Sequence, residues 1–129
     1  MPMTGTAHNS VNGGEFADRL LPVAKTLRDS LFPLVEAVTG GVMRPGRLMQ
    51  RLELDKSLAS RIFQALREEE LLEFLHRLPA PPGLRILVAA SRERRASSKL
   101  CSSTEASIEA FQELIDTTPG GRGSIACWL

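Results

Sequence analysis

The chain of 129 residues lacks the spacings on which metal sites and membrane spans depend. Its two cysteines and two histidines stand apart, without a Cys-x-x-Cys or His-x-x-x-His pattern. No apolar run approaches the roughly twenty residues that cross a bilayer. We therefore expect no metal and no membrane partner. Cys101 and Cys127 are expected to be free thiols in a reducing cytoplasm.

Patterns that support catalysis are missing as well. The sequence has no Walker-type phosphate loop, no paired carboxylates and no nucleophile with a base at a meaningful spacing. We therefore expect neither enzyme activity nor a cofactor. A hydrophobic content of 43% and a charged content of 24% are typical of a soluble globular protein. The length fits one domain with an additional helical arm.

The stretch from Leu48 to Leu66 predicts two helices separated by a tight turn. Asp55 suits the N-cap of the second helix, because its carboxylate can accept from free amides of the first turn. This helix is expected from about Lys56 to about Arg67. A period of 3.6 residues gives it one apolar stripe, which we expect to face a core: Ala59, Ile62, Phe63 and Leu66.

The opposite stripe of the second helix is polar and contains no acid. Its side chains suit phosphates and base edges in a major groove, where arginine pairs with guanine and glutamine with adenine. We expect Arg61 and Gln64 to read bases, and Ser57 and Ser60 to contact bases or phosphates. An ordinary helical hairpin with a solvated charged face is the simpler alternative, and RNA is another possible partner.

Positive charge is concentrated in this part of the chain. The preceding helix, expected from about Pro45 to Glu53, turns Leu48 and Leu52 inward. Between Arg44 and Arg67 the net charge is +4, whereas the whole chain carries +1. Such a concentration is expected of a nucleic-acid surface. Residues expected to position the DNA backbone are Arg44, Arg47, Arg51, Lys56 and Arg67.

Leu54 to Ile62, followed by Gln64-Ala65-Leu66, resembles the helix-turn-helix of bacterial transcriptional regulators, especially winged-helix proteins of the MarR and IclR kind. The match covers about twenty residues. It implies binding of double-stranded DNA, usually by a homodimer that reads two half-sites. Many members have glycine at the position of Glu53. A glutamate suits this position if the turn requires no positive φ.

A winged helix would continue with a two-stranded hairpin, but this sequence predicts helices. Apolar residues between Leu71 and Leu78 indicate a short helix. Pro79 to Gly83 form a rigid break. The apolar run from Leu84 to Ala90 is short enough for a strand or a buried helix, and we favour a helix.

Before the basic segment, a long helix is expected from about Glu15 to Val38, after a disordered lead from Met1 to Gly14. Gly40 suits the left-handed position that ends such a helix. The apolar positions follow a heptad spacing that could serve a dimer or the domain core. Internal prolines favour the core, because they break or kink helices. The heptad positions are Leu20, Ala24, Leu27, Leu31, Leu34 and Val38, and the prolines are Pro22 and Pro33.

After Ala90, the residues from Ser91 to Ser102 are expected to form a basic linker, or else a second phosphate contact. A last helix is expected from about Ser103 to Asp116, with an acidic outer face that would avoid DNA. The tail to Leu129 ends on apolar residues, including the only tryptophan. It could dock on the core or in a dimer, but we favour truncation of a longer protein.

The sequence thus predicts an all-α protein. Its expected domain, from residue 15 to 90, has a helix-turn-helix three-helix core, with additional N- and C-terminal helices and an uncertain wing. We expect sequence-specific DNA binding and transcriptional regulation in the cytoplasm. The alternative is a helical protein-interaction or dimerisation module that does not bind DNA.

Overall fold

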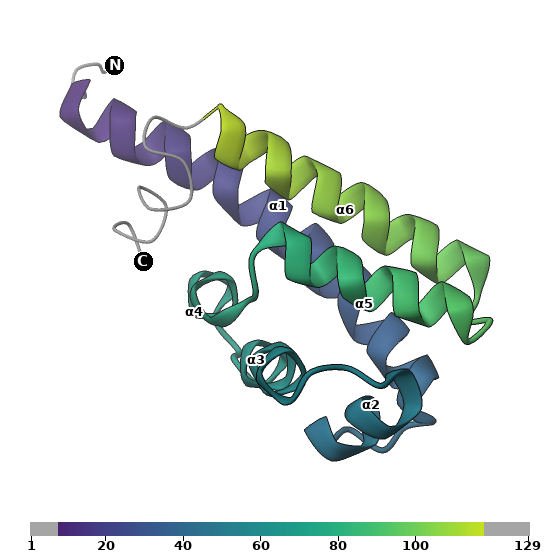
Figure 1. Ribbon diagram of the computed structural model, residues 1–129. Helices are drawn as coiled ribbons and strands as arrows, with labels where there is room; N and C mark the ends of the chain where they lie inside the picture. The colour runs from purple at the N-terminus through teal and green to yellow at the C-terminus, as the bar shows by residue number, and fades with distance from the viewer. Residues whose placement is uncertain (1–7, 118–129) are drawn as a thin grey trace.

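The protein is all-α in the part of the chain that the computed structural model describes, residues 8–117 (Figure 1). Side chains are described from Asp18 onward. No strand occurs in this range. The helices are α1 (His8–Thr39), α2 (Pro45–Leu52), α3 (Lys56–Leu66), α4 (Leu71–Arg77), α5 (Pro81–Glu93) and α6 (Ser98–Asp116).

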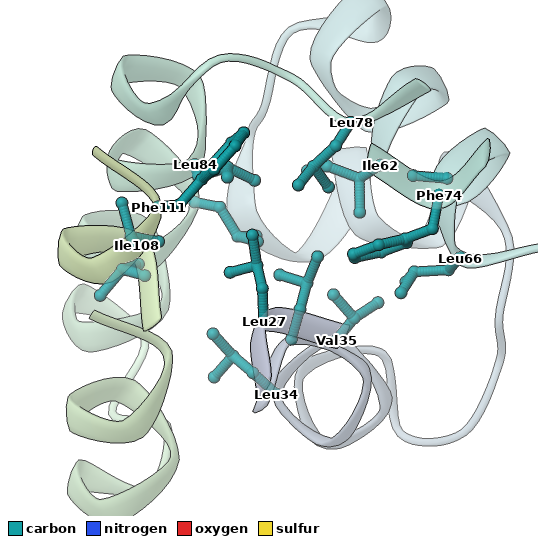
Figure 2. Close-up of a cluster of buried hydrophobic side chains, with 14 of the residues drawn as sticks. Leu27, Leu34, Val35, Ile62, Leu66, Phe74, Leu78, Leu84, Ile108 and Phe111 are labelled. Atoms are coloured by element: carbon teal, nitrogen blue, oxygen red, sulfur yellow. The ribbon is translucent and has the colours of Figure 1, made fainter. Parts of the chain in front are cut away.

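A single hydrophobic core joins the helices into one unit. The helices α5 and α6 pack together and α6 lies along α1, while α2, α3 and α4 form a smaller group against α1 (Figure 1). Figure 2 shows side chains from α1, α3, α4, α5 and α6 meeting in the core. Buried Leu48 and Leu52 join α2 to the same cluster. The shared core therefore holds α3 at a defined position.

The heptad positions of α1 are buried within the chain itself. Each is at most 8% exposed and belongs to the core. The helix continues through Pro22 and Pro33, so these prolines do not break it. Packing of the buried face against α6, α4 and α2 offsets the hydrogen bonds that proline cannot donate. The core interpretation of this seam is confirmed.

The two ends of α1 can be compared with the helix ends that the sequence predicts. The helix begins at His8, so the prediction of disorder up to Gly14 is wrong for the last seven residues of that lead. Residues 1–7 lie outside the described part of the chain. Gly40 has a φ of 66°, and the amide of Gly41 donates to the carbonyl of Glu36 at 2.9 Å. This left-handed helix end is the one predicted.

The segment expected to be a linker is mostly helical. Its first residues complete α5 and its last residues begin α6, which leaves only 94–97 outside both helices. The hydroxyl of Ser97 accepts from the amide of Leu100 at 3.4 Å and caps α6, which begins at Ser98, five residues before the expected start. Cys101 and Thr104 are buried, so packing favours helix there. The linker prediction is therefore wrong.

Small polar side chains let α6 approach α1 closely. The hydroxyl of Ser30 donates to Ser107 Oγ at 2.9 Å, and Thr104 Oγ1 donates to the carbonyl of Ser30 at 3.1 Å. Every buried side-chain nitrogen or oxygen in the described region has a hydrogen-bond partner. This interface therefore carries no desolvation penalty from unpaired polar atoms.

Helices also follow α3, where a winged helix would have its hairpin. The short α4 and the helix α5 agree with the sequence prediction, although α5 begins at Pro81 and so includes part of the expected break. Proline is acceptable in a first helical turn, because its missing amide hydrogen has no partner there. The described residues thus contain no wing.

Candidate nucleic-acid interface

Three residues, Glu53 to Asp55, connect α2 to α3. Glu53 has a φ of 56°, and its amide donates to the carbonyl of Met49 at 2.7 Å. The turn therefore adopts the left-handed conformation that glycine adopts without strain, so the condition under which a glutamate suits this position is not met. Leu54 points into the core and is 7% exposed. Asp55 caps α3 as predicted, because its Oδ2 accepts from the amide of Ser57 at 2.9 Å.

The inner face of α3 is anchored on the core. Close contact with the first turn of α5 also fixes the start of the helix. A Cβ added at Gly83 would lie 3.1 Å from Leu58 Cδ1, so the two helices approach closely there. The four residues predicted to face the core are all buried: Ala59, Ile62, Phe63 and Leu66.

The outer face of α3 presents the predicted polar stripe. Ser57, Arg61 and Gln64 are exposed and Ser60 is half-buried. Their spacing of three, four and seven residues places them on one side of the helix. Two further exposed cations flank this stripe, Lys56 in the first turn and Arg67 at the C-cap.

The cations along α3 have no carboxylate partner. Within residues 18–117, no ion pair involves Lys56, Arg61 or Arg67. Among the nearby acids, Glu53 pairs with Arg94, Glu68 pairs with Arg77 and Asp55 caps α3. No ion pair among the described residues therefore neutralises the cations of this stripe.

The arginines of α2 divide between two surfaces. Arg44 is exposed at the N-cap of α2. Arg47 and Arg51 instead line a hollow together with Arg94 and Arg95, from the turn between α5 and α6. Ser57 and Arg61 line a different groove, beside the start of α5. The structure thus brings together the stripe residues of α3, but not the whole predicted set.

Three residues beside these surfaces were not among the sequence candidates. Ile86 of α5 is 55% exposed and lines the same groove as Arg61. The 3.6-residue period of α5 places Ile86 outside its buried stripe, so the sequence contained this signal. Arg94 and Arg95 were assigned only to the basic run, because no sequence rule placed them opposite α2.

The described side chains and helices include neither a metal-ligand cluster nor a membrane-spanning helix. Residues 18–117 contain no cluster of three or more His, Cys, Asp or Glu side chains that could hold a metal ion. No described helix is both long and apolar enough to cross a bilayer. Cys101 is buried as a free thiol, and burial raises its pKa. Cys127 and the apolar tail lie outside the described residues.

Comparison with known proteins gives no match: no family model, no curated protein and no solved structure is similar to this chain.

Proposed function

We propose that this protein binds double-stranded DNA through a helix-turn-helix formed by α2 and α3, and that it regulates transcription. The observation that carries the proposal is the outer stripe of α3, which is polar, contains no acid and is flanked by unpaired cations. A face that only contacts water would usually mix both signs of charge. An exposed helix of this kind fits a major groove about 12 Å wide.

The backbone geometry supports the same proposal. A helix-turn-helix joins two helices by a turn of three to four residues that often contains glycine. Here the turn has three residues, and Glu53 adopts the conformation typical of glycine. The resemblance to MarR and IclR regulators is proposed for this unit only, because the described residues lack a wing. Core residues hold both helices: Leu48, Leu52, Leu54, Ala59 and Ile62.

Roles follow from position along the two helices. Arg61 and Gln64 would read base edges in the major groove, since each can form bidentate hydrogen bonds with a purine. Ser57 and Ser60 would contact bases or phosphates. Backbone phosphates would be bound by Arg44, Arg47, Arg51, Lys56 and Arg67.

The protein would act as a homodimer, because paired half-sites require two reading helices. The heptad seam of α1 is occupied by the core, so the dimer needs another surface. Leu21 and Phe32 are 38% and 40% exposed, and a spacing of three turns places them on one face of α1. Light scattering after gel filtration tests this step, and a monomer that remains a monomer on DNA would contradict it.

A protein-interaction module is the second candidate function. The observation that favours it is Ile86, an exposed apolar side chain in a groove with Leu58 and Pro79. Salt dependence distinguishes the two functions, because phosphate contacts release counterions and apolar contacts do not. If the five proposed cations contact phosphates, affinity for duplex falls roughly 500-fold between about 50 and 200 mM salt.

Fluorescence anisotropy with labelled duplex measures this salt dependence. A steep fall in affinity supports DNA binding. If a protein shown to be folded by circular dichroism does not bind duplex at low salt, DNA binding is contradicted and the interaction module becomes the better account.

A further inference from the structure

A hollow on a second basic surface has no role in the proposed reading of bases. We call it the arginine hollow and define it by Arg47 and Arg51 of α2 and by Arg94 and Arg95 of the α5–α6 turn. Its volume is about 670 Å³. This size lies within the range of pockets that bind small molecules. The hollow shares no residue with the groove beside Arg61.

All charged residues that line the arginine hollow are positive, because none of the lining residues is acidic. Arg51 is oriented by α1, since its Nε donates to the carbonyl of Val38 at 3.2 Å. Arg94 pairs with Glu53, which lies outside the lining. Within residues 18–117, Arg47 and Arg95 form no ion pair. Two separate segments therefore supply guanidinium groups to the hollow. Only the charge of Arg94 is balanced by an ion pair among the described residues.

The backbone at Arg95 adopts a conformation that is unusual for an arginine. Arg95 has a φ of 61°, at the position that ends α5 in a Schellman motif. The amide of Ala96 donates to the carbonyl of Ser91 at 3.0 Å, and the amide of Arg95 to that of Arg92 at 3.0 Å. Glycine is the usual residue at this position, because a side chain there is strained. Such strain is concentrated at ligand-binding sites.

We propose that the arginine hollow binds the phosphate groups of a small phosphorylated molecule. Arginine forks match phosphate oxygens in bidentate geometry, which favours phosphate over a single carboxylate. Ser97 also lines the hollow and caps α6, so the positive end of that helix dipole lies at its edge. Ala37, Val38 and Ala96 supply apolar surface for the rest of the ligand. A hollow enclosed by several segments suits a small molecule better than a duplex backbone does.

This inference does not require DNA binding. Arg47 and Arg51 are proposed contacts in both functions, so a bound ligand would also occupy two cations that the duplex uses. Arg95 belongs to the hollow alone, and it therefore separates the two functions in an experiment.

Isothermal titration of the full chain with inorganic pyrophosphate, at constant ionic strength and without DNA, tests the proposal. We expect saturable binding that Arg95→Gly weakens at least tenfold. Arg47→Gln should weaken it similarly. Arg61→Gln removes one arginine from the other surface and should change the affinity less than twofold. Arg95→Gly relieves the strained backbone, so its melting temperature should equal or exceed that of the wild type, and misfolding would not explain the loss.

Three results would overturn the proposal. The first is no saturable binding of pyrophosphate by the wild-type protein. The second is unchanged binding by Arg95→Gly, or an equal loss in Arg61→Gln. The third is a protein that does not bind pyrophosphate but loses affinity for duplex in Arg95→Gly. The hollow would then bind phosphates of the nucleic-acid backbone instead of a small molecule. Proposed DNA binding can fail in its own salt titration without affecting the first two results, which involve pyrophosphate alone.

Discussion

Two arginine-rich surfaces of this protein differ in whether their basic side chains form ion pairs. Between α5 and α6, Arg85 pairs with Glu109 at 3.0 Å and Arg92 with Glu105 at 3.1 Å. On α3, by contrast, Lys56, Arg61 and Arg67 form no ion pair with any residue in 18–117. The number of basic residues therefore does not identify an anion-binding surface. What distinguishes the two surfaces is whether a neighbouring helix supplies a carboxylate.

The unpaired surface lies on α3, whose inner face is buried in the core. Its charges repel one another in the absence of a ligand, whereas the charges between α5 and α6 are compensated within the fold. This difference underlies the proposal that α3 contacts DNA and that the α5–α6 surface serves structure.

The largest predicted effect is a loss of stability when a buried side chain of α3 is shortened. Ile62 is fully buried, so Ile62→Ala should lower the free energy of unfolding by about 2–5 kcal/mol through lost contacts and a cavity. Ile86→Ala removes the same atoms from a side chain that is 55% exposed and should cost less than about 0.5 kcal/mol. Urea denaturation measures both, and equal losses would show that α3 is not seated as described.

Removing one base-reading side chain should have the next largest effect. Arg61→Ala, and separately Gln64→Ala, should each reduce discrimination between a selected duplex and a random duplex by about 1–3 kcal/mol. Arg85→Ala removes an arginine from the paired surface and should leave discrimination unchanged. Equal losses of affinity on both duplexes from Arg61→Ala would remove its role as a base reader.

The backbone at Glu53, in the turn between α2 and α3, is strained. Glu53→Gly should raise the free energy of unfolding by roughly 0.5–1 kcal/mol, because glycine adopts a φ of 56° without a steric penalty. The lost ion pair with Arg94 contributes little, since the two side chains are 78% and 49% exposed. Glu53→Ala also removes the pair but keeps the strain. If thermal denaturation ranks alanine above glycine, the interpretation of the turn is wrong.

The smallest effect should come from a single phosphate contact. Arg47→Ala should lower the slope of log affinity against log salt by about 0.9, with similar losses on selected and random duplex. Arg92→Ala, on the paired surface, should leave the slope unchanged. A sequence-dependent loss from Arg47→Ala would assign it to base reading instead.

Local patterns were enough to predict the elements that carry the candidate site. The period of Ala59, Ile62 and Phe63 gave the buried face of α3, and Asp55 gave its start. Gly40 marked the end of α1 because left-handed backbone has a strong residue preference. These features depend on neighbours within one or two helical turns, which a sequence shows directly.

Features that depend on distant contacts were not predictable. The early start of α6 comes from packing of Cys101 and Thr104, and α1 continues through its prolines because other helices cover its buried face. The pairing of Arg85 with Glu109 joins residues from separate helices. Glu53 itself disfavours a positive φ, and the only indication of one was the glycine that many helix-turn-helix regulators have at this position.

Whether α3 reads DNA is tested by comparing duplex binding of two matched triple variants at low and moderate salt. One replaces Ser60, Arg61 and Gln64 of the α3 surface by alanine. The other replaces Ser103, Arg85 and Gln112, which removes the same three residue types from α5 and α6, away from α3. Fluorescence anisotropy should show salt-sensitive binding that the first variant loses and the second retains. Equal binding by both folded variants, or a greater loss in the second, would contradict the assignment of DNA reading to α3.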